Sequence, residues 1–239
     1  MQSERGFSIV IKKYGNCELD KIAKMTLEGN EIQLWLLHWE DLLSWITYYR
    51  KIMSSQEQEY VNRFVNYDDR MRSATGKILT RKLLAHYMNI SQEKVEISKS
   101  KYGKPILENN HEFLLSFNVS HSGKIVLVAM ARGRIVGIDV ERQHSMPDYL
   151  SLAKNFFTDK EFEIISNANN EELFFDYWTA KEAYVKAIGT GLNKELNSFE
   201  IRGNKIIDSA EQSSKWIRRK VYMQEGYIAN IVYQLTGGT

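Results

Sequence analysis

The sequence predicts an α/β (α+β) fold made of two similar, pseudo-duplicated halves, each a small sheet packed against a long helix. A run of β-branched residues at 134–142 is typical of a buried strand. Two stretches, 68–88 and 171–188, carry apolar residues at helical spacing. The order strand, helical segment, long helix and strand occurs twice, although no residue-level repeat is visible. We therefore expect an N-terminal half at 1–131 and a C-terminal half at 132–239.

Composition narrows the class of protein. The chain has 239 residues, 43% of them hydrophobic and 12% aromatic, which is typical of a soluble globular protein. Lys and Arg number 32 against 30 Asp and Glu, so net charge indicates neither a nucleic-acid nor a membrane partner. Cys17 is the only cysteine, which excludes an intramolecular disulfide. With no apolar run long enough for a membrane span or signal peptide, we expect a cytoplasmic protein. We also expect it to be a monomer.

The predicted strand at 134–142 carries two acids. Side chains two apart on a strand share a face, so Asp139 and Glu141 point the same way. Adjacent carboxylates repel, and desolvation increases the repulsion. A divalent cation such as Mg²⁺ would compensate, since it prefers hard oxygen ligands. A solvated strand end without function explains the pair equally well.

The first half contains further elements that the local sequence indicates. Residues 7–11 are apolar enough for a strand, and 31–36 alternate apolar and polar positions, which predicts a strand with one buried face. Ser54 and Glu57 have the spacing of a capping box, which opens a helix before the long helix at 68–88.

A basic loop at 98–105 follows the first long helix. Pro105 favours an extended Lys104, and Gly103 tolerates dihedral angles that other residues avoid. Such a loop can present an ammonium and backbone N–H groups to an anion. An ordinary solvated turn is the alternative interpretation.

A polar segment at 117–123 precedes a second buried-strand pattern at 124–130. Ser120 and His121, together with Asp139, suggest a hydrolase triad, but neighbours on a strand point to opposite faces. The sequence also lacks the Gly-x-Ser-x-Gly elbow of such enzymes. We therefore reject the triad.

The helix predicted at 171–188 is apolar nearly all round and should be buried. It carries Glu182 and Lys186 one turn apart, and a buried charge must be paired or must bind a metal. A plain ion pair between these two residues is one interpretation. The other places Glu182 in a metal site with Asp139 and Glu141.

Together these segments resemble the phosphopantetheinyl transferases of the surfactin-synthetase-activating (Sfp) type. The resemblance covers the chain from about Glu31 to its end, and its motifs occur in the family's order and spacing. The matching segments are Tyr102-Gly103-Lys104-Pro105, Phe117-Asn118-Val119-Ser120-His121-Ser122-Gly123, Gly137-Ile138-Asp139-Val140-Glu141, Phe156-Phe157 with Glu161, and Trp178-Thr179-Ala180-Lys181-Glu182-Ala183-Tyr184-Val185-Lys186.

The resemblance implies an active site in the cleft between the halves, where the phosphopantetheine arm of coenzyme A moves to a serine of an apo acyl or peptidyl carrier protein. It implies Mg²⁺, with Mn²⁺ as an alternative, held by Asp139, Glu141 and Glu182. It implies catalytic roles for Glu182, Lys186 and Glu141, with either glutamate as the general base. The residues implied to contact coenzyme A are Arg72, Lys104, Pro105, Ser120, His121 and Lys186.

Two departures from the family's pattern stand out. Glu57 and Tyr60 occupy positions where family members often carry lysines for the 3′-phosphate of coenzyme A. The first 30 residues or so have no recognised counterpart. Two other functions fit the same acids: a Mg²⁺-dependent hydrolase of a nucleotide pyrophosphate, and a non-catalytic module that binds coenzyme A or a carrier protein. The sequence does not indicate which biosynthetic pathway supplies the carrier.

Overall fold

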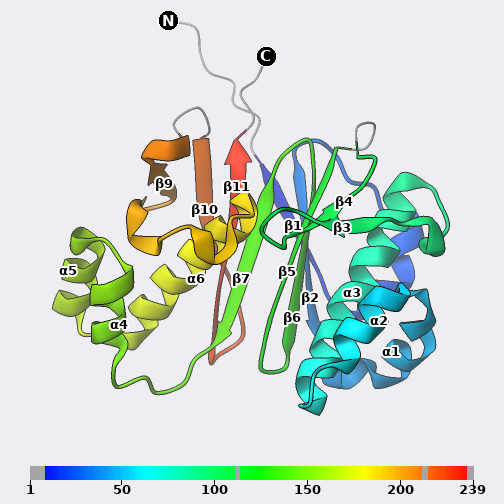
Figure 1. Cartoon of the computed structure of the whole chain (residues 1–239), viewed down its shortest axis with the longest axis horizontal. Helices are drawn as coiled ribbons and strands as arrows, with labels where there is room; N and C mark the ends of the chain where they lie inside the picture. Colours follow the sequence, from blue (N-terminus) through cyan, green and yellow to red (C-terminus); the bar gives the residue numbers. More distant parts are fainter. Residues whose placement is uncertain (1–8, 111–113, 212–214, 236–239) are drawn as a thin grey trace, which may run out of the picture.

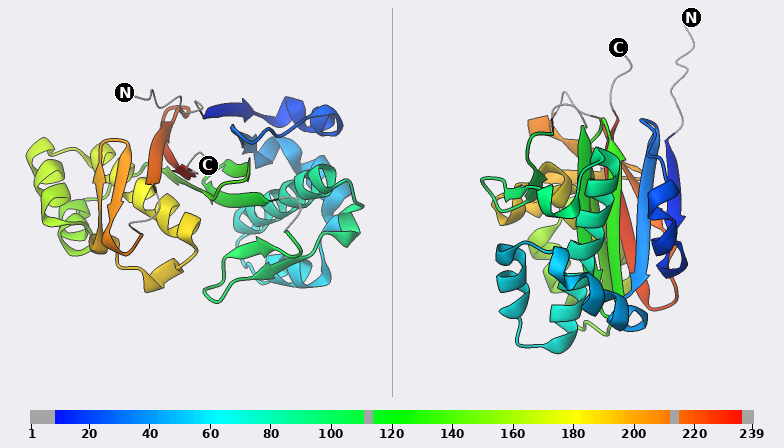
Figure 2. Two further views of the ribbon diagram at one scale, coloured as in Figure 1. Left: turned by 90° about the horizontal axis from the view of Figure 1, so that it is seen from above. Right: turned by 90° about the vertical axis from the view of Figure 1, so that its right-hand side faces the viewer.

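The computed structural model describes residues 9–110, 114–211 and 215–235. Two larger sheets stand side by side in the centre of the molecule, and the helices of the two halves lie on opposite flanks (Figure 1; Figure 2, left). In the described parts of the chain, no helix combines the length and the apolar composition needed to cross a bilayer.

The strands form three sheets, in which neighbouring strands have the orders β1-β2-β6-β5, β7-β11-β10-β9-β8 and β3-β4. The strands are β1 (Val10–Tyr14), β2 (Glu31–His38), β3 (Ile97–Lys99), β4 (Pro105–Leu107), β5 (Leu115–Ser122), β6 (Ile125–Arg132), β7 (Val136–Arg142), β8 (Phe199–Arg202), β9 (Lys205–Asp208), β10 (Lys215–Val221) and β11 (Tyr227–Leu235). The α-helices are α1 (Leu43–Tyr49), α2 (Ser55–Asn62), α3 (Tyr67–Met88), α4 (Tyr149–Phe156), α5 (Asp159–Ala168) and α6 (Glu171–Ile188).

The predicted helices are confirmed. The two long helices are α3 and α6, and each packs against the sheet of its own half. Ser54 and Glu57 form the predicted capping box: Ser54 Oγ accepts from Glu57 N at 3.2 Å, and Glu57 Oε2 accepts from Ser54 N at 2.8 Å. Helix α6 ends at Ile188 and is capped by Gly189, whose φ of +75° glycine adopts without a steric penalty.

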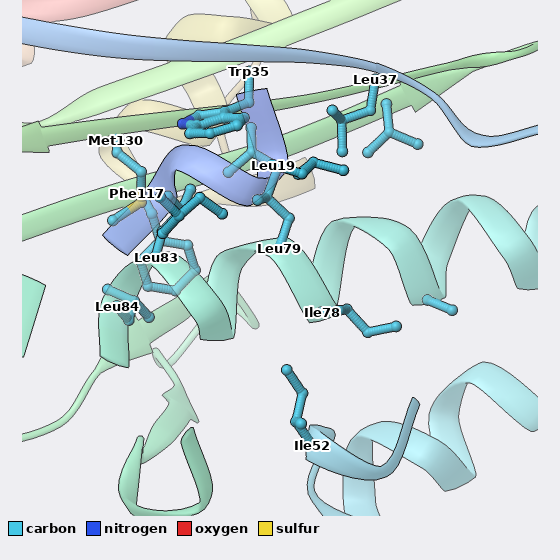
Figure 3. Close-up of a cluster of buried hydrophobic side chains, with 14 of the residues drawn as sticks. Leu19, Trp35, Leu37, Ile52, Ile78, Leu79, Leu83, Leu84, Phe117 and Met130 are labelled. Atoms are coloured by element: carbon cyan, nitrogen blue, oxygen red, sulfur yellow. The ribbon is translucent and has the colours of Figure 1, made fainter. Parts of the chain in front are cut away.

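The N-terminal core forms on both sides of α3 (Figure 3). Leu79 and Leu83 point from α3 toward the sheet, on the side where Trp35 of β2 lies. Ile78 lies on the other side of the helix, near Ile52. Ile78, Leu79 and Leu83 have no exposed surface. An apolar helix surface of this width explains why α3 lies between a sheet and a second helical layer.

The expectation that strand 31–36 buries one face is wrong, because β2 is buried on both faces. β2 lies inside its sheet, parallel to β1 and antiparallel to β6. Its polar Gln33 is fully buried, and its amide donates to Thr26 O at 2.7 Å. Of the strand predicted at 7–11, only residues 10 and 11 lie in β1, which continues to Tyr14 and stands beside β2 at the sheet edge (Figure 2, right). Residues 7 and 8 lie outside the described ranges.

The two large sheets share one core on the faces turned away from the helices. Ile32 and Leu34 of β2 and Leu127 of β6 belong to the same buried cluster as Ile138 of β7 and Ile231 of β11. All five side chains have no exposed surface. Burial of apolar area at about 25 cal/mol per Å² therefore holds the halves together as well as each half by itself.

A glycine brings each long helix close to a central strand. A Cβ on Gly137 of β7 would lie 2.1 Å from Ala183 O and 2.6 Å from Ala187 N of α6. In the other half, a Cβ on Gly76 of α3 would lie 2.7 Å from Val119 Cγ1 of β5. The close approach of α6 matters most, because its obstacle is backbone and cannot rotate away.

We expect Gly137→Ala to lower the free energy of unfolding by about 3 kcal/mol, because a methyl group at this point forces α6 away from β7. Gly29→Ala is the matched control, since a Cβ there meets nothing within 4 Å. Urea denaturation of both variants measures the difference. Equal stability of Gly137→Ala and the wild type would show that α6 adjusts freely.

Candidate active site

The two halves meet where β5 and β7 run parallel, and side chains rather than backbone carbonyls make the connection. Alternate residues of β5 place a side-chain oxygen where the carbonyl of a parallel neighbour would stand. Each oxygen accepts a backbone N–H of β7: Ser116 from Val136 at 3.3 Å, Asn118 from Ile138 at 2.8 Å, Ser120 from Val140 at 3.3 Å, and Ser122 from Arg142 at 3.0 Å. We call these four residues the seam residues. These polar residues occupy every second position of β5, and the sequence analysis did not recognise this alternation as a sign of the contact with β7.

Two of the seam residues also fix the acids of β7. Ser120 Oγ donates to Asp139 Oδ1 at 2.8 Å, and Ser122 Oγ donates to Glu141 Oε2 at 3.0 Å. Each serine therefore accepts from the backbone of β7 and donates to a carboxylate on the same strand. Asp139 and Glu141 line a common cavity, in agreement with the predicted shared face.

Lys186 reaches from α6 to this pair of acids. Its Nζ lies 2.6 Å from Asp139 Oδ1 and 3.0 Å from Ser120 Oγ. The interpretation of Lys186 as an ion-pair partner of Glu182 is therefore wrong: the close packing of α6 on β7 puts Asp139 within its reach. The side chain is also 32% exposed, so Lys186 is only partly buried.

The acids repel one another despite this ammonium. Burial raises the pKa of Glu141, and the charge of Asp139 raises it further. Burial and the charge of Asp139 likewise raise the pKa of Glu182. Lys186 opposes both shifts. Three carboxylates thus share the influence of a single ammonium.

The donor set fits a divalent cation without forming a complete site in this arrangement. Within the described residues, no three side chains of His, Cys, Asp or Glu lie close enough to hold a metal ion. Asp139 Oδ2, however, is buried and has no hydrogen-bond partner among the described residues. A buried carboxylate oxygen of this kind is suited to a hard cation.

Two cavities meet at Lys186. One of about 280 Å³ is lined by residues of both halves, among them Ser120, His121, Asp139 and Glu141. The other, of about 670 Å³, lies in the C-terminal half and is lined by Glu182 together with apolar side chains. The apolar lining includes Phe156, Trp178, Val185 and Leu196. Glu182 and Asp139 therefore face different cavities, with Lys186 common to both.

Lys104 joins the halves at a second point. Its Nζ donates to Ala187 O at 2.6 Å, near the C-terminal end of α6, where the helix dipole favours a cation. Its stem packs against Gly189, so burial lowers its pKa to about 8. Pro105, the next residue, lines the cavity of about 280 Å³ and a neighbouring one of about 400 Å³ that Lys104 also borders.

The predicted anchors Arg72 and His121 lie beside each other. Arg72 Nη1 donates to Gly123 O at 2.6 Å, and its other terminal nitrogen pairs with Asp69. His121 has exposed surface, yet the protein packed around it lowers its pKa, as do the charges of Arg72 and Lys186. The imidazole is therefore neutral near pH 7 and can donate one hydrogen bond.

Each half of the chain matches a family model of its own. A family model described as "4′-phosphopantetheinyl transferase, N-terminal" matches residues 37–132, and one described as "4′-phosphopantetheinyl transferase superfamily" matches residues 135–232. The chain is 36% identical over 187 residues to 4′-phosphopantetheinyl transferase HetI of Nostoc sp. strain PCC 7120, covering 77% of this chain and 78% of HetI.

Other similar proteins extend the comparison. The chain is 38% identical over 155 residues to 4′-phosphopantetheinyl transferase gsp of Aneurinibacillus migulanus, covering 64% of this chain and 62% of that protein. It is 29% identical over 157 residues to 4′-phosphopantetheinyl transferase Sfp of Bacillus subtilis strain 168, covering 64% and 68%. The match thus spans less than two thirds of gsp but more than two thirds of HetI and Sfp.

We expect Ser122→Ala to raise the pKa of Glu141 further above its ordinary value, because the lost hydrogen bond stabilises the ionised carboxylate. Titration of the glutamate carboxyl carbons by NMR measures the shift. Ser116→Ala is the matched control, since Ser116 accepts a β7 N–H in the same way and lies far from Glu141 along the strand. A Glu141 pKa that stays unchanged in Ser122→Ala would contradict this account.

Proposed function

The chain belongs to the 4′-phosphopantetheinyl transferase superfamily and is an enzyme of that class, and we propose that it moves the phosphopantetheine arm of coenzyme A onto a serine of an apo acyl or peptidyl carrier protein. The second product is 3′,5′-ADP. The observation that carries this proposal is the pair Asp139 and Glu141, held by two serines at the edge of a cavity that both halves line.

Asp139, Glu141 and Glu182 would hold Mg²⁺, or Mn²⁺ in its place. The unpartnered Oδ2 of Asp139 and the raised pKa values of both glutamates support this assignment, because all three reflect negative charge that is incompletely compensated. When bound, the cation supplies charge neutralisation at the pyrophosphate and orientation of its oxygens. Lys186 must then leave Asp139 for the substrate, which its partial exposure permits.

The chain's own residues divide the remaining work. Lys186 lies between the two cavities and can stabilise negative charge that grows on the leaving phosphate. His121 lines the first cavity and adds a neutral donor to the same group. Glu182 borders the wider, more apolar cavity, where the carrier serine would enter, and its raised pKa suits a general base near neutral pH.

Coenzyme A would lie across the two halves. Pro105 of β4 and Ser120 and His121 of β5 line the smaller cavity, and Lys104 borders the neighbouring cavity of about 400 Å³. The positive charge of Arg72 acts on His121, whose pKa it lowers, and therefore on this wall of the cavity. Because one chain supplies both walls of this site, we propose that the enzyme acts as a monomer, with its halves dividing at 131/132.

The test is incubation of the protein with coenzyme A, Mg²⁺ and apo carrier proteins of fatty acid, polyketide and non-ribosomal peptide synthesis. Mass spectrometry should show a carrier heavier by one phosphopantetheine group, with 3′,5′-ADP formed in equal amount. Release of 3′,5′-ADP without a carrier would favour the hydrolase. Binding of coenzyme A with no product at all would favour the non-catalytic module.

We expect Asp139→Asn to lower the rate of transfer by at least roughly a hundredfold, or about 2.7 kcal/mol in activation free energy, because a cation ligand is lost. The free energy of unfolding should change by about 1 kcal/mol or less, since the side chain of Lys186 is partly exposed and can turn to water. Single-turnover transfer and urea denaturation measure the two effects. Glu40→Gln, which removes an exposed acid paired with Lys124, is the control that should keep full activity.

We expect the affinity for coenzyme A to fall as pH rises above about 8, by up to about tenfold per pH unit. The reason is that free Lys104 loses its proton there, so binding of the phosphate must take one up. Calorimetry between pH 7 and 9.5 measures the dependence. Lys104→Arg should abolish it, because a guanidinium stays charged. A wild-type affinity that is constant over this range would remove Lys104 from the phosphate contacts.

A further inference from the structure

A fully buried asparagine connects the middle of β11 to α6. Asn230 has no exposed surface, and its Nδ2 donates to Thr179 Oγ1 at 2.8 Å and to Asp176 O and Asp176 Oδ1 at 3.0 Å each. The Thr179 oxygen is able to accept, because its own proton is donated to Phe175 O at 2.8 Å. The amide nitrogen of Asn230 is therefore directed at two residues that lie one turn apart on α6.

An amide is not the most stabilising group for this position. Asn230 Oδ1 is buried and has no hydrogen-bond partner among the described residues. Such an oxygen destabilises the fold, because it gives up its bond to water without gaining another. Ala229 and Ile231, its neighbours on β11, are fully buried and apolar. What the amide adds is direction, since its hydrogen bonds form only when α6 lies at one place along its axis.

Asn230 stands opposite one of the acids of the site. It is directly paired with Asp139, across the contact of β11 with β7. Side chains of directly paired residues share a face of the sheet, and here both reach α6. Asp139 meets Lys186 of this helix, whereas Asn230 meets Thr179, about two turns earlier. Glu182 lies between these two contact points on the helix.

The close approach at Gly137 sets the distance of α6 from β7 but not the register of the helix along its axis. The helix residues at this point are Ala183 and Ala187, whose small side chains offer a strand little to interlock with. A slip of α6 by one residue would move its side chains by about 1.5 Å and turn them by about 100°. Both charged residues that α6 brings to the site would then be displaced. Asn230 supplies the directional contact that opposes such a slip.

We propose that Asn230 is a positioning residue, whose hydrogen bonds fix α6 along its axis and so set where Glu182 and Lys186 stand relative to Asp139. The inference rests on the proposed function, in which Glu182 and Asp139 hold the cation together with Glu141. Asn230 lines neither of the two cavities that meet at Lys186, so it acts through α6 alone. The affinity for the cation then depends on a residue that does not touch it.

Substitutions can remove this contact from either end. Asn230→Leu deletes the amide and nearly keeps its size, and Asp176 retains the hydrogen bond that Arg218 Nη2 donates to its Oδ2 at 2.9 Å. Thr179→Val deletes the hydroxyl that accepts from Asn230, whereas Thr179→Ser keeps a hydroxyl at the same place. The two ends of the contact are thus tested independently.

Tyr184 of α6 offers a matched control. Its phenol donates to Asp208 Oδ2 at 2.8 Å, which is a buried hydrogen bond between the same helix and β9. Its ring contacts Phe199 and Trp216, so the ring stays in place when the hydroxyl is removed. Asp208 also keeps its ion pair with Lys194. Tyr184→Phe therefore removes a buried hydrogen bond of α6 without releasing the helix.

The experiment measures the binding of Mn²⁺ to the full chain by electron paramagnetic resonance, with coenzyme A present and no carrier. Single-turnover transfer to an apo carrier and urea denaturation accompany it. Asn230→Leu should weaken Mn²⁺ binding about tenfold or more and slow transfer, while unfolding at no lower urea concentration than Tyr184→Phe. Thr179→Val should show smaller losses in the same direction, and Thr179→Ser should behave as the wild type. Tyr184→Phe should keep the wild-type affinity for Mn²⁺.

Three results would overturn the positioning role and leave the proposed function standing. The first is Asn230→Leu with the Mn²⁺ affinity and transfer rate of the wild type. The second is an equal loss of Mn²⁺ affinity in Asn230→Leu and Tyr184→Phe, which would show general loosening of α6. If Asn230→Leu does not fold, wild-type Mn²⁺ affinity in Thr179→Val is the third. A wild type that neither binds Mn²⁺ nor transfers the arm would instead overturn the proposed function itself.

Discussion

Four side-chain oxygens on β5 satisfy the backbone of β7, and the active site depends on this contact between the halves. The N–H groups of Val136, Ile138, Val140 and Arg142 point away from β11 toward β5. An unsatisfied buried N–H costs about 1–3 kcal/mol, so the two strands are held in one register. The same hydroxyls orient Asp139 and Glu141, which couples the alignment of the halves to the alignment of the acids.

This arrangement places negative charge where the fold compensates it incompletely. Gly137 lets α6 approach β7, and the approach brings Lys186 onto Asp139. One ammonium still leaves both glutamates with raised pKa values and leaves Asp139 Oδ2 without a partner among the described residues. Because the negative charge of these carboxylates is incompletely compensated within the protein, a bound cation would stabilise the site strongly.

Lysine side chains place positive charge around the cavity that also contains the acids. Lys186 of α6 and Lys77 of α3 line this cavity, and Lys104, in the loop before β4, borders the neighbouring one, so three separate elements contribute. The lysines stand apart from the acids except where Lys186 meets Asp139. A long ligand with phosphates at two places can therefore contact both halves at once, and its binding would bridge them.

The sequence by itself determined where the two long helices lie, where α2 begins and that the two acids of β7 share a face. Apolar spacing located α3 and α6, the Ser54–Glu57 pair located the start of α2, and the two-residue period of strands put Asp139 and Glu141 together. These features arise within one or two turns of helix, or within one strand, so local periodicity is sufficient to predict them.

Only the tertiary structure decided which groups meet across elements. Lys186 pairs with Asp139 and not Glu182, Lys104 contacts the end of α6, and β2 is buried on both faces. Periodicity says which way a side chain points but not how far away the next element lies. That distance is set by the close approach at Gly137, by the core shared between the sheets, and by the side-chain contacts of β5 with β7.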